Sequence, residues 1–88
     1  MARQTICRDF TFEVPQNRPA GALAKEIAQL VGYPCDIFAD HVANGQRLVS
    51  YSLEIEPGPK INSERIEGIC RAVRGIAEAW DWASVNGR

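Results

Sequence analysis

The chain has 88 residues, of which 45% are hydrophobic and 24% are charged, and its formal net charge is −1. This is the length of one domain with one hydrophobic core, so we expect residues 1–88 to form a single domain. The near-neutral charge argues against a protein that binds polyanions in general, because such proteins are usually basic.

The cysteines and the apolar runs bear on the cellular compartment. Cys7, Cys35 and Cys70 are widely spaced and match no metal-binding or CxxC pattern. An odd number of cysteines is unfavourable in an oxidising compartment, so we expect free thiols. No apolar run approaches the ~20 residues of a membrane span, and the first residues lack the apolar core of a signal peptide. The sequence therefore predicts a cytoplasmic protein without a metal or a cofactor.

Residues 6–14 alternate between apolar and polar side chains, which is typical of a half-buried strand. The apolar face consists of Ile6, Phe10, Phe12 and Val14. Arg8 is the one charged residue on that face. Pro15 ends the strand, because proline has no N–H group to donate to a neighbouring strand.

Residues 18–31 carry apolar side chains at helical spacing and are expected to form the first helix. Asn17 is a favourable N-cap residue, and Pro19 is tolerated in the first turn of a helix. At the other end, Gly32 suits the left-handed residue that follows many helices, and Pro34 prevents continuation.

Residues 35–56 are expected to form a β-hairpin, because Asn44-Gly45 is a strong signal for a two-residue turn. After the turn, one apolar face consists of Val49, Tyr51, Leu53 and Ile55. Before the turn, Ile37 and Ala39 form one face, and the other face carries Asp36, Asp40 and, against the pattern, Phe38. The strand after the turn is therefore expected to bury one face.

A second helix is expected after the Pro-Gly-Pro break at 57–59. Asn62 or Ser63 is expected to cap its start, and Glu64 and Glu67 in its first turns suit the helix dipole. Its apolar stripe is the clearest helical periodicity in the chain and consists of Ile66, Ile69, Cys70, Val73, Ile76, Ala77 and Trp80.

The order β-α-β-β-α predicts an α+β fold. We expect a small antiparallel sheet of three strands, or four if the tail adds one, with two helices on one face in a two-layer sandwich. The opposite face of the sheet is expected to be polar and to carry Thr5, Cys7, Thr11, Ser50, Ser52 and Glu54.

The stretch QNRPAG, residues 16–21, lies where the first strand passes into the first helix. The unpaired N–H groups at the start of a helix attract anions. Arg18 could close over a bound anion with its several donors. The alternative is that Asn17 only caps the helix and Arg18 points into water, and the sequence leaves both open.

Two segments, NRPAGALAKEIAQL and CDIFADHVANGQRLVSYSL, resemble the histidine-containing phosphocarrier family (HPr), whose signature is a His, one residue and then Arg-Pro-Ala. The resemblance covers about residues 16–53 and implies an HPr-like fold. It implies that Arg18 matches the active-site arginine of the family. It also implies that Ser52 matches a serine that regulatory kinases phosphorylate in some members, with Leu53 as its hydrophobic neighbour.

The chain departs from the family at the position that carries the chemistry. Gln16 stands where the phosphoryl-accepting His belongs, and an amide cannot act as that nucleophile. The resemblance therefore implies a regulatory relative that cannot relay a phosphoryl group. The closing part also differs, because one long helix follows residue 59 where the family has a short helix, a strand and a last helix.

These observations lead us to expect a non-catalytic protein-binding or regulatory module. Its expected anion- or partner-binding residues are Gln16, Asn17, Arg18, Ser52 and Leu53. The alternative is a structural or assembly subunit that forms a homo- or hetero-oligomer through an open sheet edge and Trp82. The protein partner itself is not identified by the sequence.

Two further classes are disfavoured. Arg71 and Arg74 have acidic neighbours four residues away, and no aromatic platform for bases accompanies them, which argues against nucleic-acid binding. His41 is the single histidine, with Asp40 beside it but no nucleophile in the neighbouring sequence. We expect no enzyme, because no set of nucleophile, base and oxyanion donors can be named.

Overall fold

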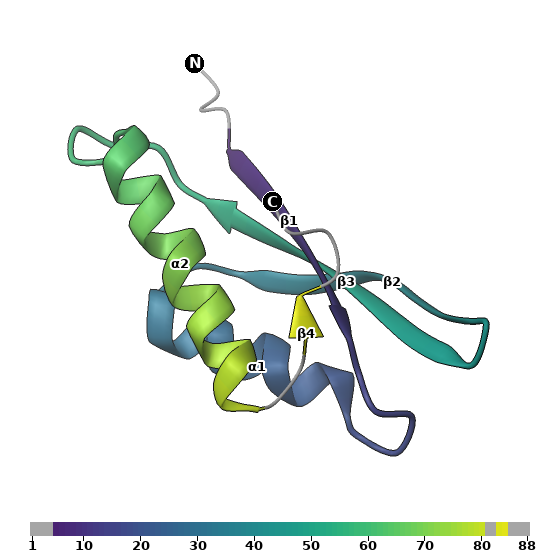
Figure 1. Cartoon of the computed structure of the whole chain (residues 1–88). Coiled ribbons are helices and arrows are strands. Elements are labelled where there is room, and N and C mark those ends of the chain that lie inside the picture. Colours follow the sequence, from purple (N-terminus) through teal and green to yellow (C-terminus); the bar gives the residue numbers. More distant parts are fainter. Residues whose placement is uncertain (1–4, 81–82, 85–88) are drawn as a thin grey trace.

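The computed structural model describes residues 5–80 and 83–84. The elements follow the order β1 (Ile6–Glu13), α1 (Ala20–Val31), β2 (Cys35–Ala43), β3 (Gln46–Ile55), α2 (Ser63–Ala79) and β4 (Ala83–Ser84). The strands pair antiparallel in the spatial order β2-β3-β1-β4, which gives the split β-α-β arrangement. Both helices lie on the same face of the sheet (Figure 1). The predicted two-layer α+β fold is confirmed, and the short β4 supplies the fourth strand that the sequence left open.

The core lies between the sheet and the two helices. Alternate residues of β1 and β3 face the helices and pair with each other, as Phe10 does with Tyr51 and Phe12 with Val49. The largest fully buried side chains are Tyr51, Phe12, Leu23, Ile27, Leu53, Ile55, Val14, Val49 and Val73. Each such burial contributes about 1.5–3 kcal/mol, so contact between the two layers is the main stabilising interaction.

Helix α1 begins at Ala20 rather than at residue 18, and without the predicted cap. Pro19, not Asn17, occupies the N-cap position, and no side chain caps the helix. A residue that precedes proline is disfavoured in the helical conformation, which keeps Arg18 out of the helix. Residues 15–18 form a turn instead, in which the Arg18 N–H donates to the Pro15 carbonyl at 3.0 Å.

The other helix boundaries agree with the predictions. Gly32 follows α1 with a φ of 82°, and its N–H donates to the Ala28 carbonyl. Asn62 caps α2, because its side-chain oxygen accepts a hydrogen bond from the Arg65 N–H at 2.8 Å. Neither α1 nor α2 is long and apolar enough to cross a membrane.

The β2–β3 hairpin turns at Asn44 and Gly45, as predicted, with φ angles of 53° and 79°. Strand β2 departs from a regular ladder at one point. Ile37 pairs with Tyr51 whereas Ala39 pairs with Ser50, the residue next to Tyr51. Phe38 is therefore the extra residue of a β-bulge.

The bulge exchanges the two faces of β2 beyond Phe38, because one extra residue shifts a pattern of period two to the opposite face. Asp40 pairs with Val49, whose side chain is in the core, so Asp40 lies on the helix side of the sheet. Asp36 pairs with Ser52 and lies on the other side. The prediction that Asp36 and Asp40 share a face is therefore wrong.

The face of the sheet that points away from the helices is polar, as predicted, and we call it the open face. Thr11 and Ser50 pair across β1 and β3, and their hydroxyl oxygens lie 2.9 Å apart in a hydrogen bond. Cys7 and Glu54 are exposed and also pair with each other. This face contributes little to the core.

Candidate functional site

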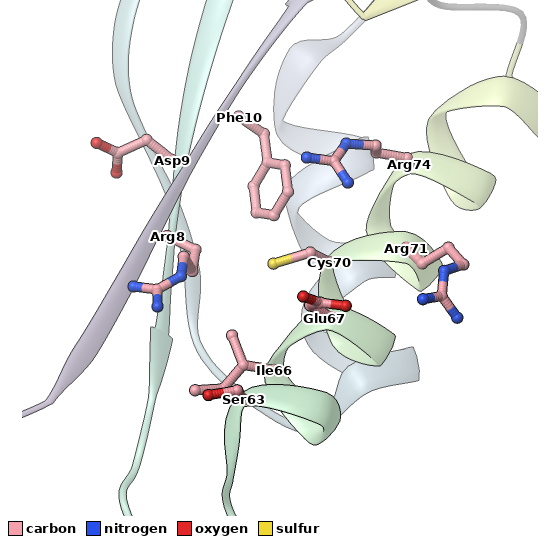
Figure 2. Close-up of a pocket in the computed structure, with 9 residues that line it drawn as sticks. All are labelled: Arg8, Asp9, Phe10, Ser63, Ile66, Glu67, Cys70, Arg71 and Arg74. Carbon is pink, nitrogen blue, oxygen red and sulfur yellow. The ribbon is translucent and has the colours of Figure 1, made fainter. Parts of the chain in front are cut away.

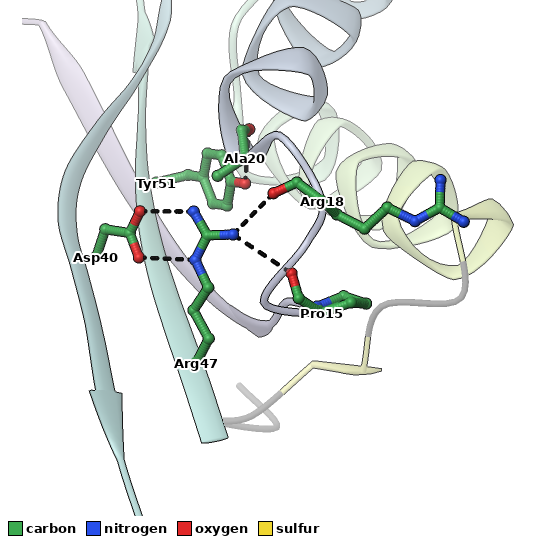
Figure 3. A network of polar contacts seen from close by, with 6 residues as sticks. All are labelled: Pro15, Arg18, Ala20, Asp40, Arg47 and Tyr51. Atoms are coloured by element: carbon green, nitrogen blue, oxygen red, sulfur yellow. Dashed lines mark hydrogen bonds and ion pairs between the residues drawn. The ribbon is translucent and has the colours of Figure 1, made fainter. Parts of the chain in front are cut away.

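The loop between β1 and α1, which contains the QNRPAG stretch, is fixed to the hairpin by Arg47. The Arg47 Nη1 donates to the Arg18 carbonyl at 2.7 Å and to the Pro15 carbonyl at 3.3 Å (Figure 3). The Gln16 side-chain amide donates to the Gly45 carbonyl at 3.4 Å. The start of α1 and the turn of the β2–β3 hairpin therefore lie side by side.

Arg47 also forms a two-point ion pair with Asp40 (Figure 3). Its Nε and Nη2 donate to the two carboxylate oxygens at 3.0 and 2.8 Å. These hydrogen bonds hold the pKa of Asp40 below its ordinary value. The Arg47 side chain is only 16% exposed, so most of its donors are already bound within the protein. This arrangement stabilises the loop and leaves few Arg47 N–H donors for a ligand.

Tyr51 connects the same region to the core. Its hydroxyl donates to the Ala20 carbonyl at 2.9 Å, and its ring is fully buried. Burial raises the pKa of Tyr51 well above its ordinary value, so this hydroxyl stays protonated and keeps donating. The first residue of α1 is therefore anchored to β3.

Three of the predicted site residues, Gln16, Asn17 and Arg18, lie together in this exposed loop. The Arg18 side chain extends away from the Arg47–Asp40 pair (Figure 3). The anion site expected at the helix start stays a prediction. The expected geometry of this anion site changes, because Arg18 is the last residue of the turn before Pro19 and is not a helical residue.

The structure does not bring Ser52 and Leu53 to that loop. Ser52 lies on the open face, directly between Asp9 on β1 and Asp36 on β2. A phosphoryl group there would lie next to two carboxylates, which is electrostatically unfavourable. Leu53 is fully buried in the core, so its predicted role in partner contact is replaced by a packing role. Trp82, the predicted interface residue, lies outside the described residues.

A pocket of about 610 Å³ lies between β1 and α2 (Figure 2). Its one sign in the sequence is Arg8, the charged residue on the apolar face of β1. Its lining residues are Arg8, Asp9, Phe10, Ser63, Ile66, Glu67, Cys70, Arg71 and Arg74. The guanidinium of Arg74 lies 5.9 Å from the centre of the Phe10 ring, within cation–π range. We call this cavity the β1–α2 pocket.

The outer edge of β1 borders the β1–α2 pocket and is open over much of its length. Within the described residues, β4 pairs only with Phe12 and Glu13, at one end of β1. The remaining part, from Ile6 to Thr11, has β3 on one side and no described strand on the other. An exposed strand edge presents unpaired backbone groups to a partner.

The direction of these backbone groups follows from the register. The Val14 N–H donates to the Arg47 carbonyl, so even-numbered residues of β1 direct their backbone groups toward β3. Odd-numbered residues, among them Cys7 and Asp9, therefore direct theirs outward. The Arg8 Nη1 donates to the Cys7 carbonyl at 2.9 Å, which agrees with an outward carbonyl that no strand of the described residues binds.

The thiols and the single histidine form no metal site, since the described residues contain no metal-binding group of His, Cys, Asp and Glu side chains. All three cysteines are free. Burial, with a smaller contribution from Asp36, raises the pKa of Cys35 to about 11, so this thiol is a poor nucleophile near neutral pH. His41 is exposed and pairs with Leu48 on the open face.

Comparisons with known proteins bear on the fold. No family model and no curated protein matches the chain. The fold is similar to that in the cryo-EM structure of the A320V variant of MSL1 from Arabidopsis thaliana, with a TM-score of 0.65. The sequence identity is 8%, and the match covers 97% of this chain but 36% of that one. This likeness supports the α+β fold and no more, and the resemblance to HPr stays a prediction.

Proposed function

We propose that this domain is a non-catalytic protein-binding module that accepts an extended segment of a partner protein along the open edge of β1. The observation that carries the proposal is the combination of a strand edge, residues 6–11 of β1, that no strand among the described residues covers, with a pocket beside it. The outward N–H and C=O groups of β1 would bind the partner backbone, and the β1–α2 pocket would receive alternate side chains. Domains that recruit a peptide by strand addition divide affinity and specificity in this way.

The proposal keeps the predicted absence of phosphoryl relay, because Gln16 lacks a nucleophilic side chain. It moves the recognition surface from the QNRPAG loop to β1 and α2. The backbone carbonyls of Pro15 and Arg18 in that loop are already bound by Arg47. The three free thiols suit a reducing compartment such as the cytoplasm.

Proline substitution at the two sheet edges tests this function. Asp9→Pro removes an outward N–H of β1 without removing a β1–β3 hydrogen bond, and proline is tolerated on edge strands. Val42→Pro is the matched control on β2. Val42 pairs with Arg47, whose backbone carbonyl bonds to Val14 on β1, so the Val42 N–H also points outward.

A displayed library of random peptides would be selected on the full chain, and the recovered peptides would be assayed on both variants. We expect the peptides to lose binding to Asp9→Pro and to keep binding to Val42→Pro. Amide NMR spectra would establish that both variants are folded. Peptides that bind Asp9→Pro as tightly as the original chain would refute strand addition at β1.

A second candidate function, assembly of copies of this chain, is favoured by the outer edge of β2. Its exposed apolar side chains, together with one on α1, are Leu30 at 67%, Ile37 at 37%, Phe38 at 58% and Val42 at 59% exposure. A two-fold axis would place β2 of a second copy antiparallel to β2 and bury both sets. We expect the molar mass in solution to reach that of a dimer at high protein concentration, and Phe38→Asp to return it to that of a monomer. A monomer mass at all concentrations would exclude this assembly.

A further inference from the structure

We propose that the segment accepted by β1 is acidic, with carboxylate side chains at alternate positions that enter the β1–α2 pocket, and that Arg8 exchanges its own backbone partner for one of these carboxylates. This inference rests on the proposed function and adds the chemistry of the partner. It follows from the geometry of an added strand, from the charges around the pocket, and from the present contact of Arg8.

The geometry selects which side chains of the partner enter the pocket. Side chains of a strand alternate between its two faces, and directly opposed residues of adjacent strands lie about 4.5–5.5 Å apart. Arg8 pairs with the buried Leu53, so Arg8 lies on the helix side of the sheet. A segment beside β1 would therefore place every second side chain next to Arg8 and Phe10, between β1 and α2.

The charges around the pocket favour an anionic side chain. Figure 2 shows Arg8 on the β1 side and Arg71 and Arg74 on the α2 side of the cavity. Two acids line the pocket: Asp9 points away from α2 in this view, and Glu67 lies on the α2 side, four residues before Arg71. An entering carboxylate would meet the guanidinium group of Arg8, and arginine binds carboxylates with two-point geometry.

The floor of the pocket strengthens this attraction. Phe10 is only 4% exposed, and Ile66 and Cys70 are half-buried apolar side chains packed against the core. A charge pair that forms over such a floor is screened less by water than a pair on an open surface. The same floor would pack against the methylene groups of a glutamate side chain, and the positive charge of Arg8 favours glutamate over lysine there.

The Arg8 side chain covers part of the β1 edge in this structure. Its Nη1 donates to the Cys7 carbonyl, one of the outward groups of the edge. The backbone N–H of an added strand would take over this carbonyl. The displaced guanidinium would then pair with a carboxylate of the partner, so one hydrogen bond of the free protein is replaced by two or more in the complex. Charged residues on a free edge also discourage unwanted pairing.

A capped, fluorescently labelled peptide of alternating glutamate and valine, about eight residues long, is the probe. Its dissociation constant for the full chain would be measured by anisotropy against a lysine–valine peptide of the same length. We expect the glutamate peptide to bind more tightly and to weaken as salt is added. Backbone amide shifts should include Cys7 and Asp9.

Substitutions then test Arg8. Arg8→Gln is expected to weaken binding of the glutamate peptide about tenfold, the loss of one charge-assisted contact, and Arg8→Lys to recover part of it. Arg65→Gln is the matched control, because Arg65 is an exposed arginine of α2 outside the pocket. If Arg8→Gln and Arg65→Gln weaken binding of the glutamate peptide equally, the effect arises from the net charge of the protein alone, and the specific role of Arg8 is refuted.

The outcomes separate this inference from the proposed function. If the glutamate peptide binds no better than the lysine peptide while library peptides still require the edge at Asp9, the acidic partner is excluded and strand addition stands. If no peptide depends on Asp9, both fail. If the chain itself dimerises and Asp9→Pro abolishes the dimer, the occupant of the edge is a second copy and the acidic segment is refuted.

Discussion

The guanidinium of Arg47 and the carboxylate of Asp40 form a two-point contact, at 3.0 and 2.8 Å, in the regular part of the hairpin between the bulge at Phe38 and the turn. A strand that alternated regularly from Ile37 to Asp40 would place the carboxylate on the open face, away from Arg47. The same guanidinium binds the Pro15 and Arg18 carbonyls. The extra residue in β2 therefore allows Ile37 and Asp40 to lie on the same side of the sheet, the side of Arg47.

Deletion of Phe38 should leave this contact in place. The residues on either side already pair with Tyr51 and Ser50, which are consecutive, so the deletion gives a regular ladder. We expect a folded variant whose free energy of unfolding in urea changes by about 1 kcal/mol or less. Deletion of Val42, which is equally exposed but lies within the regular part of β2, should cost more because it misaligns the turn.

The Arg47–Asp40 pair also provides the readout for the deletion. Asp40→Asn, which leaves the bonds from Arg47 to the Pro15 and Arg18 carbonyls in place, should destabilise the Phe38 deletion variant and the original chain by the same amount. A deletion variant that is insensitive to Asp40→Asn would mean that Asp40 had left the helix side, and the account of the bulge would be wrong. Equal sensitivity in the Val42 deletion would show that the assay does not report on this contact.

The pH dependence of stability should contain a contribution from Asp40. Its pKa is lowered in the folded state, mainly by the hydrogen bonds from Arg47, so its stabilising effect is present above the unfolded pKa of about 3.9. The effect is lost as the pH falls through the folded pKa. Because the Asp40 side chain is 39% exposed, Asp40→Asn should cost at most about 1 kcal/mol at pH 7.

Unfolding curves for Asp40→Asn and the original chain, recorded between neutral and strongly acidic pH, check this contribution. The difference between them should shrink toward zero at the acidic end. Asp36→Asn is the control, since Asp36 lies on the open face opposite Ser52 and away from Arg47. A difference that stays constant with pH would mean that the charge of Asp40 contributes nothing to stability.

The fold could be predicted because its signals are local. The alternation in β1 and β3 and the apolar stripe of α2 each indicate burial of one face, and the buried faces must pack against each other in two layers. The Asn44-Gly45 turn indicates the hairpin. The bulge could not be predicted, because Phe38 is marked only by apolar character on a polar face. The prediction that α1 starts at residue 18 with Asn17 as its cap is wrong, because Pro19 disfavours the helical conformation at Arg18.

The two candidate cap residues should differ in their effect on stability. Asn62 accepts a hydrogen bond from the Arg65 N–H, so Asn62→Ala should cost about 1 kcal/mol of unfolding free energy. Asn17 makes no cap for α1, so Asn17→Ala should change it by less than about 0.5 kcal/mol. Urea unfolding of both variants is the measurement. A larger loss in Asn17→Ala would restore the cap that the sequence suggested.

The candidate site was largely hidden from the sequence, because it depends on contacts between distant segments. Arg8 on an otherwise apolar strand face was its one local sign, and the structure gives that residue a free edge and a pocket. Arg47 is the parallel case, a charged residue on the core face of β3. A charge at such a position requires a partner, but the partners Asp40, Pro15 and Arg18 cannot be identified without the tertiary fold.

The thiols should differ in their reactivity. Burial raises the pKa of Cys35 to about 11, whereas Cys7 is exposed on the open face. In a Cys7→Ser, Cys70→Ser variant, alkylation of Cys35 at pH 8 should be slower in the folded protein than in urea by on the order of a hundredfold, because the thiolate is the reacting species and the unfolded pKa is about 8.5. Mass spectrometry after timed additions of iodoacetamide gives both rates.

The pH profile distinguishes the raised pKa from simple shielding of Cys35. If the raised pKa governs the rate, alkylation of the folded protein should increase about tenfold for each unit of pH up to about pH 10 and level off only above the pKa of about 11. Shielding alone would give a rate that levels off near the unfolded pKa of about 8.5. Asp36→Asn should raise the rate slightly, since Asp36 adds to the shift. A plateau near pH 8.5 would therefore contradict the assignment, even if Cys35 reacts slowly.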